Sequence, residues 1–293
     1  MNRLASLVII ALTATSSLFA AKKETITLRT KNFSEIEASI PANIVVKENA
    51  DSAGLIVYTI ASEYKDLLEF KWSSNKLNCK IKKNTSVRNL RLNTITIYNN
   101  GSISKAKING SGSLILTRAK IGKNLNLEIN GSGDIVANNV GNVKGSVNGS
   151  GDITIKSVDA SKANFNINGC GNIKVTGYLK AKDVEAAING SGDISSATTQ
   201  ATNVTCSLNG SGNIIIKGIC KTAKYSLVGS GNINCSNLKA SKVDATSQSS
   251  GTIKCYASEE FIGNAKSNSG NIICNGKPTK TTISGRTNRI KIK

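Results

Sequence analysis

The sequence has no histidine in its 293 residues, 1 tryptophan and only 4% aromatic residues. The absence of histidine excludes catalytic triads with a histidine base and metal sites with imidazole ligands. The scarcity of aromatic side chains argues against the stacking platforms that bind single-stranded nucleic acid, so no nucleic-acid partner is expected. After residue 21, no apolar run approaches the ~20 residues of a membrane-spanning helix, and we expect no integral membrane span there.

Acidic residues are also few, since 18 Asp and Glu stand against 38 Lys and Arg, giving a formal net charge of +20. A surface of this sign attracts acidic polysaccharide, lipopolysaccharide phosphates or membrane headgroups. Lysines on outward strand positions also keep a long sheet soluble and block pairing at its edges. Both interpretations of the charge stay open.

Residues 1–21 have the order of a secretory signal peptide: a basic start at Arg3, an apolar stretch over 4–12, and small residues before Ala20 and Ala21. The apolar stretch is too short to span a membrane, which favours removal of the segment over an uncleaved anchor. We therefore expect an exported protein, in the periplasm, on the outer cell surface or secreted.

Glycine is abundant, with 26 residues, and it recurs in a corner where two glycines flank one small residue, Ser or Cys. The first glycines of successive corners lie 18–21 residues apart, and a period near 20 is typical of a solenoid. Glycine allows positive φ and lets stacked backbones approach closely. The predicted corner glycines are Gly110, Gly112, Gly131, Gly133, Gly149, Gly151, Gly169, Gly171, Gly190, Gly192, Gly210, Gly212, Gly229 and Gly231.

Aliphatic residues alternate on both sides of each corner, as Ile129, Ile135 and Ala137 do around Gly131. Alternation is the strand period, so the sequence predicts an all-β, single-stranded parallel β-helix with about 20 residues per coil. A leucine-rich-repeat solenoid fits less well, because most repeats lack its leucines and have no helical segment. A third inward column is expected at Ile121, Val140, Val158, Leu179, Ile219 and Leu238.

The period divides the chain into segments. Residues 22–101 lack it and are expected to form a β region that leads into the solenoid and covers its open end. Residues 102–275 form the β-helix. Residues 276–293 are a basic C-terminal tail, with a last strand expected around Ile290 and Ile292.

The repeated corner resembles the head domain of autotransporter adhesins, the GIN-domain family of secreted bacterial proteins. The resemblance covers roughly residues 24–275. It implies a right-handed parallel β-helix and an adhesive or binding role. Besides the corners, it rests on Phe33 and Ile36, Ile44–Lys47, Leu77, Cys79 and Ile81, and Ile95, Ile97 and Tyr98.

Three corner carboxylates, on Asp134, Asp152 and Asp193, raise two catalytic or metal-binding alternatives. Repeated corner carboxylates bind calcium in some parallel coils, but here Asn, Ser or Thr fills the other copies, so the charge is too low for a hard cation. A polysaccharide-active enzyme needs a cleft with converging carboxylates, and repeats of 18–21 residues leave no room for long loops. We expect turn-capping side chains, with no metal, cofactor or catalytic residue.

Seven cysteines leave at least one unpaired. Cys235, Cys255 and Cys274 occupy an inward column that elsewhere holds Ile and Val, which predicts buried thiols, and a disulfide between two of the three stays open.

The sequence therefore predicts an exported, non-enzymatic surface protein that binds an anionic glycan, such as acidic polysaccharide or lipopolysaccharide, or another envelope component. A polysaccharide-active enzyme and a passive envelope scaffold are the alternatives, and the oligomeric state stays open.

Overall fold

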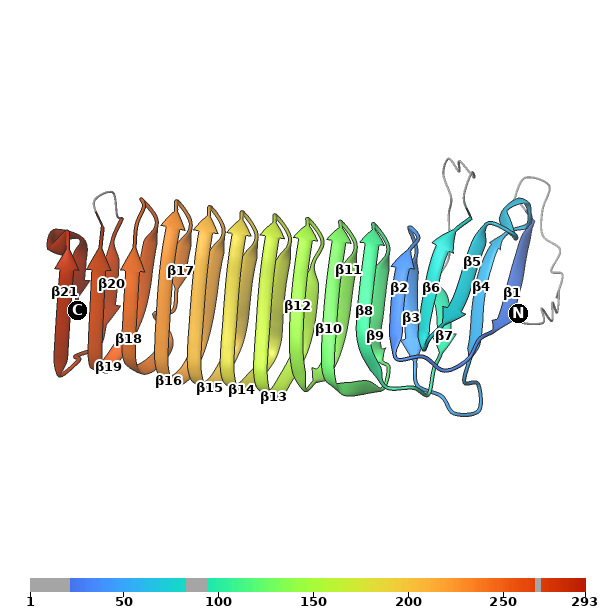
Figure 1. Ribbon diagram of the computed structural model, residues 1–293, viewed down its shortest axis with the longest axis horizontal. Helices are drawn as coiled ribbons and strands as arrows, with labels where there is room; N and C mark the ends of the chain where they lie inside the picture. The colour runs from blue at the N-terminus through green and yellow to red at the C-terminus, as the bar shows by residue number, and fades with distance from the viewer. Residues whose placement is uncertain (1–21, 83–93, 267–269) are drawn as a thin grey trace.

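The computed structural model describes residues 22–82, 94–266 and 270–293, and the expected signal peptide at 1–21 lies outside this part. The described residues are nearly all in β-strands, stacked side by side into one long solenoid (Figure 1). Their only helical segments are two short 3-10 turns, η1 (Ser62–Tyr64) and η2 (Thr287–Arg289). No helix in the described ranges is long and apolar enough to cross a membrane.

The solenoid has about 9 turns of roughly 20 residues, as the glycine period predicts. Successive strands pair in parallel, and Gly131 lies beside Gly149 on one side and beside Gly110 on the other. The all-β parallel fold is therefore confirmed. The strands of the coils are β8 (Ile103–Gly110), β9 (Ser113–Arg118), β10 (Ile121–Gly131), β11 (Asp134–Val140), β12 (Asn142–Gly149), β13 (Ile153–Gly169), β14 (Asn172–Gly190), β15 (Asp193–Gly210), β16 (Asn213–Gly229), β17 (Asn232–Asn234), β18 (Leu238–Ser247), β19 (Thr252–Ala265), β20 (Ile272–Asn275), β21 (Lys280–Gly285) and β22 (Ile290–Ile292).

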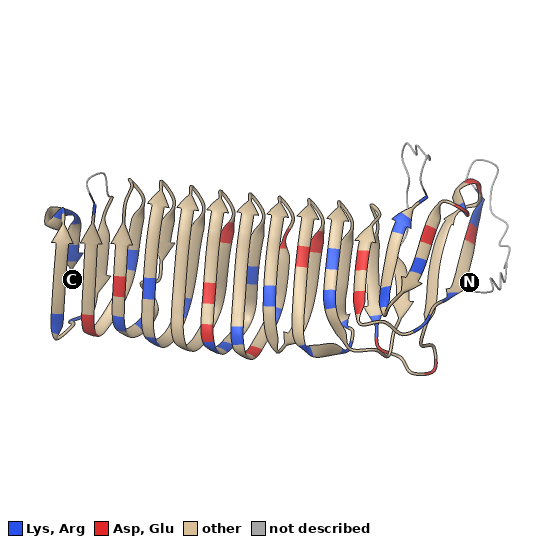
Figure 2. Cartoon of the chain, viewed as in Figure 1, with Lys and Arg blue, Asp and Glu red and all other residues tan. Residues whose placement is uncertain are grey.

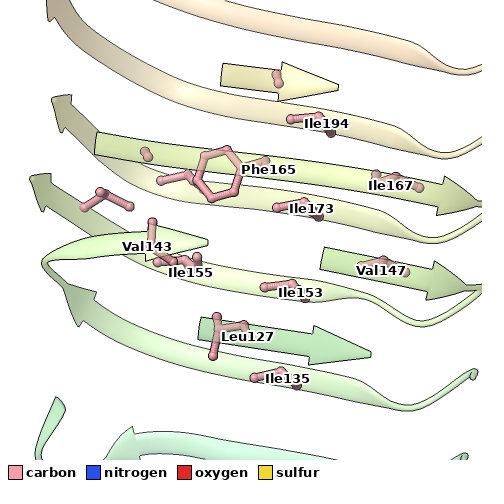
Figure 3. Close-up of a cluster of buried hydrophobic side chains, with 14 of the residues drawn as sticks. Leu127, Ile135, Val143, Val147, Ile153, Ile155, Phe165, Ile167, Ile173 and Ile194 are labelled. Atoms are coloured by element: carbon pink, nitrogen blue, oxygen red, sulfur yellow. The ribbon is translucent and has the colours of Figure 1, made fainter. Parts of the chain in front are cut away.

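One dry core runs the length of the solenoid. The residues four positions after each corner glycine, such as Ile153, Ile173 and Ile214, are fully buried. They face residues that precede the corners, including Val147 and Ile167 (Figure 3). Because every coil repeats the same inward positions, each side chain packs against its counterpart above and below, which is how a solenoid builds a core from short units.

The third inward column is one residue away from its expected place in one coil. Ile219 is 52% exposed, so its assignment to the core was wrong. The inward position there is Gly218, which lies in register between Thr199 and Leu238. In the preceding coil, the Thr199 and Ser196 hydroxyls share a 2.6 Å hydrogen bond. The coil of β15 therefore buries a polar pair at a place where other coils bury aliphatic residues. A buried, bonded polar pair is tolerated, and the neighbouring glycine lets the backbone approach it.

The N-terminal region mixes parallel and antiparallel pairing. Two of its strands continue the solenoid, because β2 lies between β6 and β8 and β3 lies between β7 and β9. The others pair antiparallel, β1 with β4, β4 with β7 and β5 with β6. The bounds are β1 (Lys23–Arg29), β2 (Glu35–Ser39), β3 (Asn43–Lys47), β4 (Leu55–Ala61), β5 (Leu68–Ser73), β6 (Lys76–Ile81) and β7 (Ile95–Tyr98).

At the other end of the solenoid, residues 276–293 include two strands. β21 pairs with β19, and β22 pairs with β20, so the segment expected as a basic tail adds a further coil.

Candidate functional site

Each corner needs both of its glycines: close stacking on the previous coil requires the second, and the first from Gly131 onward combines such stacking with a positive φ. The first glycine has φ between +116° and +147° from Gly110 to Gly229, a region that L side chains rarely adopt. The second glycine lies against the previous coil, where an added Cβ would stand only 1.9–2.1 Å from a carbonyl oxygen. Such close stacking leaves no space for a ligand between neighbouring corners.

The corner carboxylates hold successive coils together. Asp134 Oδ1 accepts the backbone N–H of Asp152 at 3.0 Å, and Asp152 Oδ1 accepts the N–H of Asn172 at 2.8 Å. Asp193 Oδ1 accepts both the N–H and the side-chain Nδ2 of Asn213, at 2.8 and 3.0 Å. Within the part of the chain that the structure describes, no three Asp, Glu or Cys side chains are grouped so that they could hold a metal ion. The structure thus gives these carboxylates a turn-capping position.

Replacing Asp193 by alanine should lower the free energy of unfolding by about 1–2 kcal/mol, because the N–H of Asn213 loses its acceptor. Asp193→Asn is the matched control. It should unfold almost like the parent chain, since Asn172 already performs the same task for the N–H of Asp193. Urea denaturation followed by circular dichroism measures the free energy of unfolding of both variants. Equal losses of stability in the two would contradict a stabilising role for the hydrogen bond from the Asn213 N–H to the side chain at position 193.

Lysines recur at the bends opposite the corners, as well as along the strands (Figure 2). Four acids, Asp159, Asp183, Glu259 and Glu260, accompany the lysines along this edge. The lysines of the bends are Lys120, Lys123, Lys162, Lys180, Lys182, Lys221, Lys239, Lys242 and Lys280, and all are exposed.

Two shallow hollows lie on the sheet face beside this edge. The larger, hollow 1, has a volume of about 430 Å³ and crosses β8, β10, β12 and β13. The smaller, hollow 2, has a volume of about 270 Å³ and crosses β15, β16, β18 and β19. Hollow 1 is lined by Ser104, Asn124, Leu125, Asn126, Asn142, Val143, Lys144, Lys162 and Asn164. Hollow 2 is lined by Asn203, Val204, Thr205, Thr222, Ala223, Lys224, Lys242, Val243, Asp244, Glu260 and Ile262.

Hollow 1 has a polar rim of outward side chains. Leu125 and Val143, which are adjacent in register, lie beneath it, but both are almost completely buried and belong to the core. Asn142 is fixed in the rim, because its Nδ2 donates to Asn124 Oδ1 at 2.9 Å and its Oδ1 accepts the N–H of Lys162 at 3.0 Å. Outward amide and ammonium groups around a shallow hollow suit a polar, anionic ligand such as a charged sugar.

The lysines of the two hollows differ in their electrostatic surroundings. No carboxylate lies within 4 Å of the Lys144 or Lys162 ammonium among the described residues. The nearest acids in register are Glu185, which accepts from Asn164, and Asp183, which accepts from Asn203. In hollow 2, the Lys242 ammonium lies 3.4 Å from Glu260. The charge of hollow 1 is therefore the less neutralised of the two.

Lysines further toward the N-terminus are also paired with acids. Lys107 lies 2.8 Å from Glu128, and this hydrogen bond raises the pKa of Lys107 and lowers the pKa of Glu128. Lys76 forms an ion pair with Glu37. Burial opposes ionisation of Glu37, but Lys76, Asn109 and Lys107 together outweigh it, and the pKa of Glu37 is lowered. These lysines are occupied by internal partners.

The single tryptophan has a structural environment. Trp72 Nε1 donates to the carbonyl of Asn32 at 3.1 Å, and the Lys31 ammonium lies 5.0 Å from the ring centroid. The indole ring is 38% exposed at the N-terminal end, far along the chain from hollow 1. These contacts hold the ring within the N-terminal region.

Comparison with known proteins now identifies the family. The family model described as "Putative auto-transporter adhesin, head GIN domain" matches residues 32–200 and 164–278. The chain belongs to this family. The family is named for adhesion, with no enzymatic activity in its description. No curated protein matches the sequence.

Solved structures are similar to this GIN-domain chain over most of its length. A "putative adhesin" from Parabacteroides distasonis is 18% identical, with a TM-score of 0.52, covering 93% of this chain and 95% of that chain. A "putative lipid binding protein" from the same species is 23% identical, with a TM-score of 0.49, and covers 92% of this chain and 96% of that chain. At these identities the likeness concerns the fold alone.

The sequence predicts the corners but gives no sign of hollow 1. Its rim residues come from three coils, and only the register brings Asn124, Asn142 and Lys162 together. Asn and Lys do occur just after the bends, but they do not recur at a fixed spacing, so the sequence alone does not mark them as neighbours.

Proposed function

We propose that this GIN-domain protein is an exported, surface-located binding head that holds a linear anionic glycan along its sheet face, with hollow 1 as the principal contact. The observation that supports the proposal is the pair of exposed lysines, Lys144 and Lys162, beside an asparagine rim; among the described residues, neither ammonium has a carboxylate within 4 Å. The family description supports adhesion as the general role.

The residues of hollow 1 divide the work of recognition. Lys144 and Lys162 attract carboxylate, sulfate or phosphate groups of the glycan. Asn124 and Asn126 offer amide groups to sugar hydroxyls. Strands about 4.8 Å apart repeat these groups along the solenoid axis, so an extended polymer can lie across several coils.

The decisive experiment is an array of acidic polysaccharides and lipopolysaccharides, with neutral glycans of similar length as controls, at two salt concentrations. We expect binding to acidic glycans that weakens as salt rises, because exposed charges are screened. Analysis of the recovered glycan distinguishes the alternatives: shortened chains would indicate an enzyme, and the absence of binding at low salt would indicate a passive scaffold.

A further inference from the structure

The last coils of the solenoid contain a group of buried thiols that the binding surface does not use. Cys206, Cys235, Cys255 and Cys274 are fully buried, and Cys220 is 8% exposed. The thiols confirm the expectation of inward cysteines at the positions where other coils hold Ile and Val. The other cysteines are Cys79, buried near the N-terminal end, and Cys170, exposed in a corner.

Two of these thiols are neighbours in register. Cys255 of β19 pairs with Cys274 of β20, in parallel strands. Parallel neighbours have Cα atoms about 4.8 Å apart, within the ~4.4–6.8 Å over which disulfides form. The two thiols share a hydrogen bond, which raises the pKa of Cys255 and lowers the pKa of Cys274.

Cys235 lies beside this pair but outside a strand. β17 ends at Asn234, and the N–H of Cys235 still donates to the carbonyl of Lys254 at 2.7 Å, which continues the register toward Cys255. Its thiol faces Cys206 across the core, and the hydrogen bond to Cys235, together with burial, raises the pKa of Cys206. Of the three cysteines that the sequence leaves open, only Cys255 and Cys274 are paired within strands.

We propose that Cys255 and Cys274 form an intramolecular disulfide that fastens the coil of β20 and β21 to the solenoid. The Cys274 thiolate attacks the disulfide of an oxidised thiol–disulfide reagent or exchange protein, giving a mixed disulfide and releasing one thiolate. The Cys255 thiolate then attacks the Cys274 sulfur and releases the second. Two protons and two electrons leave the protein, and the oxidant is reduced to two thiols.

The position suits a fastening. β20 and β21 contain only 4 and 6 residues, whereas β13 to β16 contain 17 to 19. A short strand pair contributes few hydrogen bonds to its neighbour, and each coil of a solenoid is held only by adjacent coils. A bridge there strengthens the least extensive interface. Both sulfurs are inaccessible in the closed coil, so oxidation takes place before that coil docks or when it opens.

The test uses the full chain, refolded with oxidised glutathione or kept reduced with a phosphine, then alkylated in denaturant and digested with trypsin. Cleavage at lysine separates the two residues, because Cys255 begins the peptide 255–266 and Cys274 lies in the peptide 267–280. We expect the oxidised sample to contain these two peptides linked, with a mass about 2 Da below their sum. Recovery of both peptides alkylated after oxidation, or a link from Cys274 to the peptide of Cys235, would overturn the assignment.

Two variants separate this bridge from other thiol chemistry. Cys170→Ser removes the exposed thiol and should keep the linked peptides, whereas Cys274→Ser should abolish them. Amide hydrogen exchange over 270–285 should slow at least tenfold on oxidation of the parent and Cys170→Ser proteins, and should not change in Cys274→Ser. Equal exchange rates in the oxidised and reduced parent protein would show that the disulfide does not stabilise the docked coil, and would overturn the proposal.

Discussion

Replacing Gly210 by alanine should destabilise the solenoid more than any other single methyl addition proposed for this chain. Gly210 has φ +141°, and an added Cβ would lie 2.0 Å from the carbonyl oxygen of Gly190. The contact is with backbone, so no side chain can turn away to relieve it. Backbone strain alone costs about 1–3 kcal/mol, and displacement of the stacked corner adds to it, so we expect a total loss of about 4 kcal/mol or more.

Gly110→Ala is the matched control for this variant. Gly110 has the same corner position and φ +128°, but an added Cβ there has no atom within 4 Å. It should therefore show only the strain, about 1–3 kcal/mol. Thermal and urea unfolding, followed by far-UV circular dichroism, measure the difference. If the two variants lost the same stability, close approach of stacked corners would not be what requires glycine.

The sequence predicts the fold well because the repeat records the same physical demand many times. A corner that needs positive φ selects glycine, and an inward strand position selects an aliphatic residue, so both recur with every coil. The Ile219 error shows the limit of this reasoning. The step from Ile214 to Gly218 in β16 is one residue shorter than the matching step from Ile194 to Thr199 in β15, so Gly218, which has no side chain to count as apolar, takes the inward place.

Hollow 1 could not be predicted in the same way. A binding surface depends on which outward side chains become neighbours, and outward positions are chemically permissive, so Asn, Ser, Thr and Lys replace one another without a period. The sequence gives the sign of the charge. The structure adds which lysines are paired, for example Lys107 with Glu128, and which face open space, as Lys144 does. The distinction decides where an anion can bind.

Reversing the charge of hollow 1 should cause the largest loss of binding. In the double variant Lys144→Glu, Lys162→Glu, two attractions to the glycan become repulsions. At an exposed site each reversal is worth about 1 kcal/mol, so the Kd for an acidic glycan should rise roughly 10- to 100-fold. Both side chains are exposed, so the fold should persist, which the circular dichroism spectrum and the melting temperature check.

Hollow 2 supplies the control with the same change in net charge. The variant Lys224→Glu, Lys242→Glu alters a hollow whose lysines already lie beside Asp244 and Glu260, so its Kd should rise less than about threefold. Isothermal titration calorimetry at two salt concentrations measures both variants, and the gap between them should narrow at high salt because screening reduces both effects. Equal losses would mean that the glycan responds only to the overall charge of the protein, and hollow 1 would then have no special role in adhesion.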